Sequence, residues 1–272
     1  MLPPLRVVLR LLFLLLAVYG GLCLVLFLAQ DRLLFPAAGL GRGKPIPALT
    51  NVRTDWLDLR EGLRVRLAVA TSTPARAWMV FFGGNGEDLR SGVHWASAWR
   101  EYGMNVVVPE YPGYGDSDGS PTEAALLDMA RAAASWARAR AARDGLPLIA
   151  AGASLGSFPA VQIAADGLAD RLLLIAPFTS VCDVASARFW YMPVRWLLRH
   201  PMDNIARAGA VKVPVFVLHG DVDEIIARRF GEALATALHA RFVCAPGCGH
   251  NDLPLDVHGP FGADVRAFLH GE

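Results

Sequence analysis

The chain has 272 residues, of which 54% are hydrophobic, and a formal net charge of +1. This length and apolar content are sufficient for one sizeable α/β core and an additional apolar segment. The near-neutral charge and the lack of a basic stripe argue against an electrostatic grip on nucleic acid, so no nucleic-acid partner is expected.

The first predicted element is an uncharged segment over residues 11–29, dominated by leucine, valine and phenylalanine. As a helix it would span roughly 28 Å, close to the hydrocarbon thickness of a bilayer. A cleaved signal peptide would have a shorter apolar core and small residues at its end, whereas Phe27 and Leu28 are bulky. A helix buried in the core of the protein is the alternative. We predict that residues 1–30 form a retained membrane anchor.

Positive charge around this segment favours one orientation. Arg6 and Arg10 precede it closely, whereas Arg32 follows it and Arg42 and Lys44 lie farther away. The closer cluster is N-terminal, which favours a cytoplasmic N-terminus. The rest of the chain is therefore expected on the non-cytoplasmic side of a single-pass membrane protein, as in a bacterial periplasm.

A linker is predicted over residues 31–50, much of it rich in proline and glycine. Beyond it, predicted strands and helices alternate through residues 51–272, which indicates an α/β fold with a mostly parallel central sheet flanked by helices. The strands are predicted over residues 52–59, 63–70, 77–82, 105–109, 146–151, 171–176, 213–218 and 241–245.

Two helix boundaries carry specific expectations. Ser120 is predicted to cap the longest soluble helix, with Pro121 at its first position and Glu123 completing a capping box. The final helix is predicted over residues 255–269, which would contain His258.

The segment Gly152–Gly156 joins a predicted strand to a predicted helix and has serine at its centre, Ser154. A sharp turn of this kind exposes a serine hydroxyl above a sheet, as nucleophilic attack on an ester requires. The N–H of Leu155, at the helix start, could stabilise an oxyanion. The alternative, a tight turn with a capping serine, is disfavoured by the strand before it and the helix after it.

Two further loops follow predicted strands. His219–Asp223 follows one strand and Gly249–Leu253 follows another, so both lie at the sheet edge where parallel sheets bind ligands. The chain order Ser154, Asp223, His250 is that of an α/β-hydrolase triad. Asp221 competes with Asp223 for the acid role. His258 is the competitor of His250, and its predicted place inside a helix disfavours it.

Residues 82–86 close the strand over 77–82 with three glycines around Asn85. Glycine allows the backbone to approach a substrate, and we assign the second oxyanion donor to the N–H of Asn85. A plain glycine turn is the alternative.

Four cysteines are present, of which Cys244 and Cys248 lie just before His250. A structural zinc site needs four ligands, and no second pair completes one, so no metal is expected. Idle thiols are favoured, and a disulfide between these two is left open.

These motifs resemble the α/β-hydrolase superfamily, especially its branch of single-pass hydrolases that includes protein depalmitoylases and lysophospholipid hydrolases. The resemblance begins near Asp31 and includes residues 30–36, 83–87, 111–117 and the three motifs above. In that pattern the acid lies four residues after the histidine of His-Gly, which selects Asp223. The branch usually has His-Gly where this chain has Gly83 and Gly84, and arginine at Pro112.

The resemblance also implies a short cap, here around residues 179–203, whose aromatic residues would line an acyl pocket, touch the membrane or simply pack on the sheet. We expect a serine hydrolase that cleaves carboxylic esters or thioesters of small-molecule, lipid or acylated substrates and needs no cofactor. A peptidase on the same fold and a catalytically silent membrane scaffold are the alternatives.

Overall fold

The structure is a computed structural model that describes residues 4–272. Its centre is one eight-stranded sheet in the order β1-β2-β4-β3-β5-β6-β7-β8. The first two strands pair antiparallel and β2 pairs antiparallel with β4, whereas all later pairs are parallel. The strands are β1 (Val52–Asp58), β2 (Arg64–Ala70), β3 (Ala77–Phe82), β4 (Met104–Pro109), β5 (Leu148–Ala153), β6 (Arg171–Ile175), β7 (Val215–Gly220) and β8 (Arg241–Ala245). The predicted mostly parallel α/β fold is confirmed.

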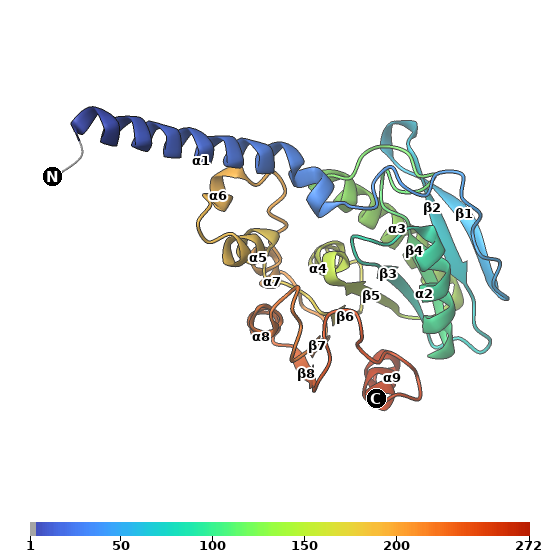
Figure 1. The fold of residues 1–272 in the computed structure, drawn as a ribbon. Helices are drawn as coiled ribbons and strands as arrows, with labels where there is room; N and C mark the ends of the chain where they lie inside the picture. The colour runs from blue at the N-terminus through green and yellow to red at the C-terminus, as the bar shows by residue number, and fades with distance from the viewer. Residues whose placement is uncertain (1–3) are drawn as a thin grey trace.

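Helices cover both faces of the sheet (Figure 1). Along β3, Val80 and Phe82 point into one apolar core, and Met79 and Phe81 point into the other, as the two-residue period of a strand requires. The first core is closed by α3 (Glu123–Asp144), α4 (Ser157–Ala165) and α8 (Arg228–Ala237), and the second by α2 (Leu89–Glu101) and α9 (Gly262–His270). Because both faces are covered, the inner strands are almost wholly apolar.

The N-terminal helix α1 (Leu5–Leu34) projects away from the α/β body (Figure 1). Thirty residues extend about 45 Å, more than the roughly 30 Å of bilayer hydrocarbon. None of its residues is buried by the protein. Within residues 4–272, α1 is the one helix long and apolar enough to cross a membrane, as either an anchor or a signal sequence. The helix continues through Leu34, so residues 31–34, expected in the linker, are helical.

A cap lies between β6 and β7, beside the C-terminal half of α1 (Figure 1). It contains the short helices α5 (Val181–Arg188), α6 (Val194–Leu197) and α7 (Ile205–Ala208). The hydroxyl of Tyr19 donates a hydrogen bond to the carbonyl of Tyr191, 2.8 Å away. The cap therefore contacts α1 well inside its apolar stretch.

Two predicted helix boundaries are wrong. The cap of α3 is Thr122, whose hydroxyl accepts a hydrogen bond from the N–H of Ala125, rather than Ser120. No capping box forms, because the Glu123 carboxylate instead accepts the N–H of Met202. The final helix α9 begins at Gly262, so His258 lies in the turn before it, with its side chain exposed.

Candidate active site

Ser154 lies on the sharp turn between β5 and α4, where Ser154–Gly156 form a single 3₁₀ turn, η2. Its φ of 51° is in the left-handed region, which is strained for a residue with a side chain. The flanking glycines are sterically required. A Cβ on Gly152 would collide with the carbonyl of Gly156, and a Cβ on Gly156 would collide with that of Phe82. The turn therefore holds the serine hydroxyl above the end of the sheet.

The loops after β7 and β8 bring an imidazole and a carboxylate to this hydroxyl. His250 Nε2 lies 3.0 Å from Ser154 Oγ, and His250 Nδ1 lies 2.7 Å from Asp223 Oδ2. The carboxylate can only accept, so Nδ1 carries the proton and Nε2 is left free to accept from the serine. The side chains of Asp223 and His250 are 0% and 7% exposed, so this relay is shielded from water.

Asp223 is held as an anion by several donors. Burial alone would raise its pKa, but hydrogen bonds from His219, His250 and the N–H of Ile226 outweigh burial and hold the pKa well below its usual range. Its Oδ1 accepts the N–H groups of Ile225 at 2.9 Å and Ile226 at 2.7 Å. The carboxylate is thus charged and fixed before any substrate arrives.

His219 is a second imidazole on the same carboxylate. It is fully buried, and its Nε2 lies 2.9 Å from the carbonyl of Ile226 and 3.2 Å from Asp223 Oδ2. Both neighbours are acceptors, so Nε2 carries the proton. Nδ1 faces Gly231, where a Cβ would collide with the ring. Helix α8 therefore clamps this imidazole against Asp223.

The loop after β3 faces the serine from the other side. The Tyr111 hydroxyl donates to the carbonyl of Gly83 at 2.5 Å, and the Tyr114 hydroxyl donates to the carbonyl of Asn85 at 2.7 Å. Burial raises the pKa of both phenols, so both remain protonated donors. With its carbonyls held in this way, the loop keeps a fixed course beside Ser154.

A carboxylate occupies the place where a side chain at position 83 would lie. Glu87 accepts the N–H of Gly84 at 3.2 Å and the indole N–H of Trp95 at 2.8 Å. A Cβ on Gly83 would collide with this carboxylate. The glycine at position 83, which departs from the His-Gly pattern, therefore makes room for Glu87, which braces the loop.

The C-terminal end of α1 also joins this loop. The side-chain amide of Asn85 donates to the carbonyl of Leu34, 3.0 Å away, one of the last carbonyls of α1 that lack a partner within the helix. The loop at the centre of the site is thereby tied to the apolar helix.

A cavity of about 800 Å³ opens in front of Ser154. Ser154, His250, Asn85 and Leu155 line its floor, and most of the remaining lining residues are apolar. Its volume lies within the range of small-molecule sites.

Known proteins resemble this chain in sequence and in fold. No protein-family model matches the chain. Over 93% of its length, the chain is 32% identical to protein Rv2307c of Mycobacterium tuberculosis and covers 91% of that protein. It is 28% identical to human alpha/beta hydrolase domain-containing protein 17B, over 75% of this chain and 70% of that protein. Esterase Pf2001 of Pyrococcus furiosus has a TM-score of 0.66 at 15% identity, covering 85% of this chain and 98% of its own.

The chain belongs to the α/β-hydrolase superfamily. The resemblance seen in its motifs is confirmed, and so is the fold. In this α/β-hydrolase, Ser154, Asp223 and His250 lie on the loops that follow β5, β7 and β8.

The competing side chains lie elsewhere. Asp221 is exposed and accepts the N–H of Gly247. Cys244 and Cys248 are both free thiols. Within residues 4–272, no group of three or more histidine, cysteine or acidic side chains is arranged to hold a metal ion.

Sequence reasoning missed three parts of this α/β-hydrolase site: the His219 contact with Asp223, the Glu87 brace and the link from Asn85 to Leu34. The spacing of His219 and Asp223 could have indicated the first. The other two depend on rotamers and on contacts between distant segments, which leave no local signal.

Proposed function

We propose that this α/β-hydrolase cleaves carboxylic ester or thioester bonds of lipid or acylated substrates through an acyl-enzyme on Ser154. The observation that carries the proposal is the chain of contacts from Asp223 through His250 to Ser154, with distances of 2.7 and 3.0 Å. Both distances are those of hydrogen bonds: the contact with Ser154 could pass its proton to His250, and the contact with Asp223 orients the imidazole. The human alpha/beta hydrolase relative and the Pyrococcus furiosus esterase support hydrolysis of this kind.

In the first step, Ser154 Oγ attacks the substrate carbonyl carbon and its proton moves to His250 Nε2. The resulting oxyanion receives hydrogen bonds from the N–H groups of Asn85 and Leu155. The intermediate collapses, the bond to the alcohol or thiol breaks, and His250 returns its proton to that leaving group. Asp223 stays ionised and stabilises the imidazolium.

In the second step, water replaces the alcohol or thiol. His250 takes a proton from water, the hydroxide oxygen attacks the acyl carbon, and the bond to Ser154 Oγ breaks as His250 returns the proton to it. The products are a carboxylic acid and the free enzyme. These steps use no metal or organic cofactor.

We further propose that α1 is a single-pass anchor, that residues 51–272 form the catalytic domain, and that the segment around 179–203 is its cap. The support is the length and exposure of α1, together with the closer positive charges at its N-terminus, which favour a catalytic domain on the non-cytoplasmic side, in the periplasm of a bacterium.

The test measures hydrolysis of p-nitrophenyl esters and matched acyl thioesters by the full-length protein and by Ser154→Ala. Turnover by the wild type and loss of about six orders of magnitude in kcat by the variant support the proposal. Wild-type protein that cleaves peptides but no ester or thioester would favour the peptidase alternative. Protein that turns over none of these and does not react with a fluorophosphonate would favour the scaffold.

A further inference from the structure

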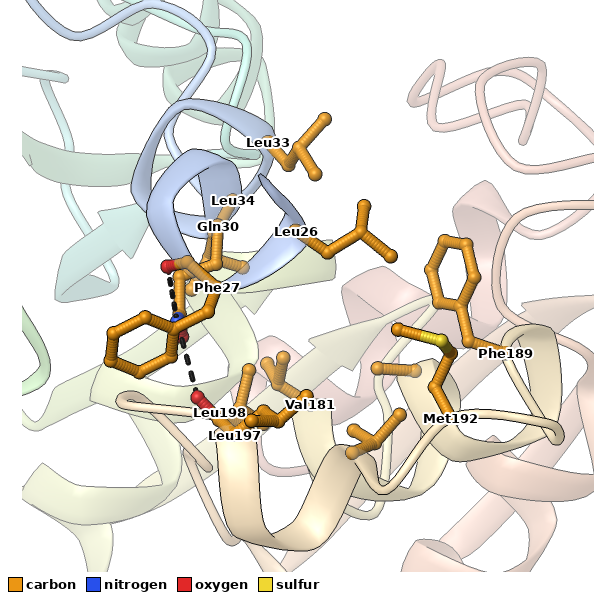
Figure 2. A pocket seen from close by; sticks show the side chains of 12 residues that line it. Leu26, Phe27, Gln30, Leu33, Leu34, Val181, Phe189, Met192, Leu197 and Leu198 are labelled. Atoms are coloured by element: carbon orange, nitrogen blue, oxygen red, sulfur yellow. Dashed lines mark hydrogen bonds between the residues drawn. The ribbon is translucent and has the colours of Figure 1, made fainter. Parts of the chain in front are cut away.

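An apolar groove runs between the C-terminal end of the anchor helix and the cap (Figure 2). Its cavity has a volume of about 200 Å³. The anchor contributes Leu26, Phe27, Gln30, Leu33 and Leu34, and the cap contributes Val181, Ala185, Phe189, Met192, Val194, Leu197 and Leu198. Apart from Gln30, every lining residue is apolar.

The polar end of Gln30 does not interrupt this apolar lining. Its amide N–H groups lie 2.8 Å from the carbonyl of Phe27 and 3.1 Å from that of Leu197 (Figure 2). Its oxygen accepts the N–H of Arg199 at 2.7 Å. The hydrogen bonds of the amide therefore join the two walls of the groove. The anchor helix and the cap are held together while the space between them remains apolar.

The groove adjoins the cavity in front of the candidate nucleophile. The residues that line both spaces are Leu33, Leu34, Val181, Ala185 and Phe189. A linear apolar group that passed between these shared side chains would reach from the flank of α1 toward Ser154 along mostly apolar side chains.

The outer surface of the cap has the residues typical of a membrane interface. Trp190 and Trp196 are 82% and 89% exposed, and Tyr191 beside them is also exposed. Tryptophan and tyrosine concentrate where a bilayer meets water. Because the cap also contacts Tyr19 of the anchor helix, a bilayer around α1 would bring lipid to the mouth of the groove.

We propose that this groove holds the acyl chain of a membrane-resident ester or thioester, with the anchor helix as one of its walls. This inference rests on the proposed function. The anchor would then select the substrate as well as tether the enzyme. A chain that moves sideways from the bilayer into the groove stays out of water, whereas a route through water would cost about a factor of four for each exposed methylene.

The experiment uses the full-length protein in phosphatidylcholine nanodiscs and p-nitrophenyl esters of four to sixteen carbons. Its readout is the ratio of kcat/KM for a fourteen-carbon ester to that for a four-carbon ester. In Ala185→Phe, the new ring would fill the passage shared by the groove and the cavity, and the ratio is expected to fall at least tenfold. The matched control is Ala187→Phe on the exposed side of the same helix, with a ratio equal to that of wild type.

A second variant protects the test against misfolding of the first. Val194 lines the groove but not the cavity, so Val194→Phe is expected to reduce turnover of the longest esters and spare eight-carbon ones. Fluorophosphonate labelling of each variant reports whether it is folded.

The two proposals fail in different ways. Wild-type protein that hydrolyses no ester of any length would overturn the proposed function. If the wild-type protein hydrolyses esters and neither Ala185→Phe nor Val194→Phe alters the ratio, only the proposal that the groove holds the acyl chain would be overturned.

Discussion

The proposed catalytic edge of the sheet, which holds Ser154, Asp223 and His250, and the groove beside α1 are built in opposite ways. At the catalytic edge, polar side chains stand on loops that follow the parallel strands β5, β7 and β8, and the buried Asp223 accepts hydrogen bonds on both oxygens. The groove consists of apolar side chains from α1 and the cap, joined by few polar contacts such as those of Gln30.

This difference predicts how each region tolerates change. Removing one partner from a buried charged network leaves the others unpaired, which is costly. Enlarging or trimming an apolar wall changes contact area in small steps. Substitutions at the catalytic edge should therefore abolish or strongly reduce turnover, whereas those in the groove should change which chains are turned over.

After the loss of Ser154 itself, the largest effect is expected from Asp223→Asn. An amide here can present its N–H₂ group to the imidazole and favour the wrong tautomer of His250, so kcat should fall about 10⁴-fold. The same chemical change at exposed Asp221, two positions earlier, should leave kcat near the wild-type value. Steady-state kinetics with a four-carbon ester measure both. Equal losses in the two variants would contradict the acid role of Asp223.

His219→Leu should have the next largest effect. The substitution removes the buried N–H that faces Asp223 and the carbonyl of Ile226, and a loss of about tenfold in kcat is expected. His258→Leu, on an exposed turn, is the control. If His219→Leu matched wild type in kcat, the second imidazole would have no part in positioning the carboxylate.

A smaller effect is expected from Asn85, which joins the loop after β3 to the end of α1. Asn85→Ala keeps the backbone N–H but loses the hydrogen bond to the carbonyl of Leu34, so kcat should fall about threefold to tenfold. The decrease should be in kcat rather than in KM, because the loop faces the developing oxyanion. A rise in KM alone would assign Asn85 to substrate binding instead.

The smallest effect concerns stability and pH. Burial raises the pKa of Glu87, and the hydrogen bonds from Trp95 and Gly84 offset this only in part. Its contribution to stability is therefore fully present below about pH 4, near the unfolded pKa, and is lost as pH rises through the folded value. Glutamine does not ionise, so the Glu87→Gln variant does not lose this stability as pH rises.

Differential scanning calorimetry at pH 4, 6 and 8 would compare the two proteins. The midpoint of Glu87→Gln relative to wild type should rise by about 2–4 °C between the lowest and highest pH. A constant difference would show that the Glu87 carboxyl has the same pKa in the folded and unfolded chains.

The turn that holds Ser154 could be predicted because its two glycines, its serine and the strand and helix around them are contiguous in the sequence. Gly152 and Gly156 are each required by a backbone carbonyl that their own strand–turn–helix unit or the neighbouring strand supplies. The start of α3 was misplaced because a distant backbone N–H, that of Met202, takes the Glu123 carboxylate away from the helix end. Local patterns cannot reveal such a partner.

The groove lay beyond sequence reasoning for the same reason. Gln30 and Leu197, which join its walls, are 167 positions apart, and Asn85 and Leu34 are 51 apart. The apolar composition of residues 11–29 predicts a membrane segment. It does not predict which face of that helix another segment covers. The sequence reveals the aromatic residues of the cap, but only the fold shows that the cap lies beside α1 (Figure 1).

The central claim is that Ser154 is the residue that becomes acylated, and mass mapping of a fluorophosphonate adduct tests it most directly. Tandem mass spectrometry of the labelled, digested full-length protein should find one adduct per chain, on Ser154, and none in Ser154→Ala. An adduct on another residue, or unchanged labelling of Ser154→Ala, would contradict the account.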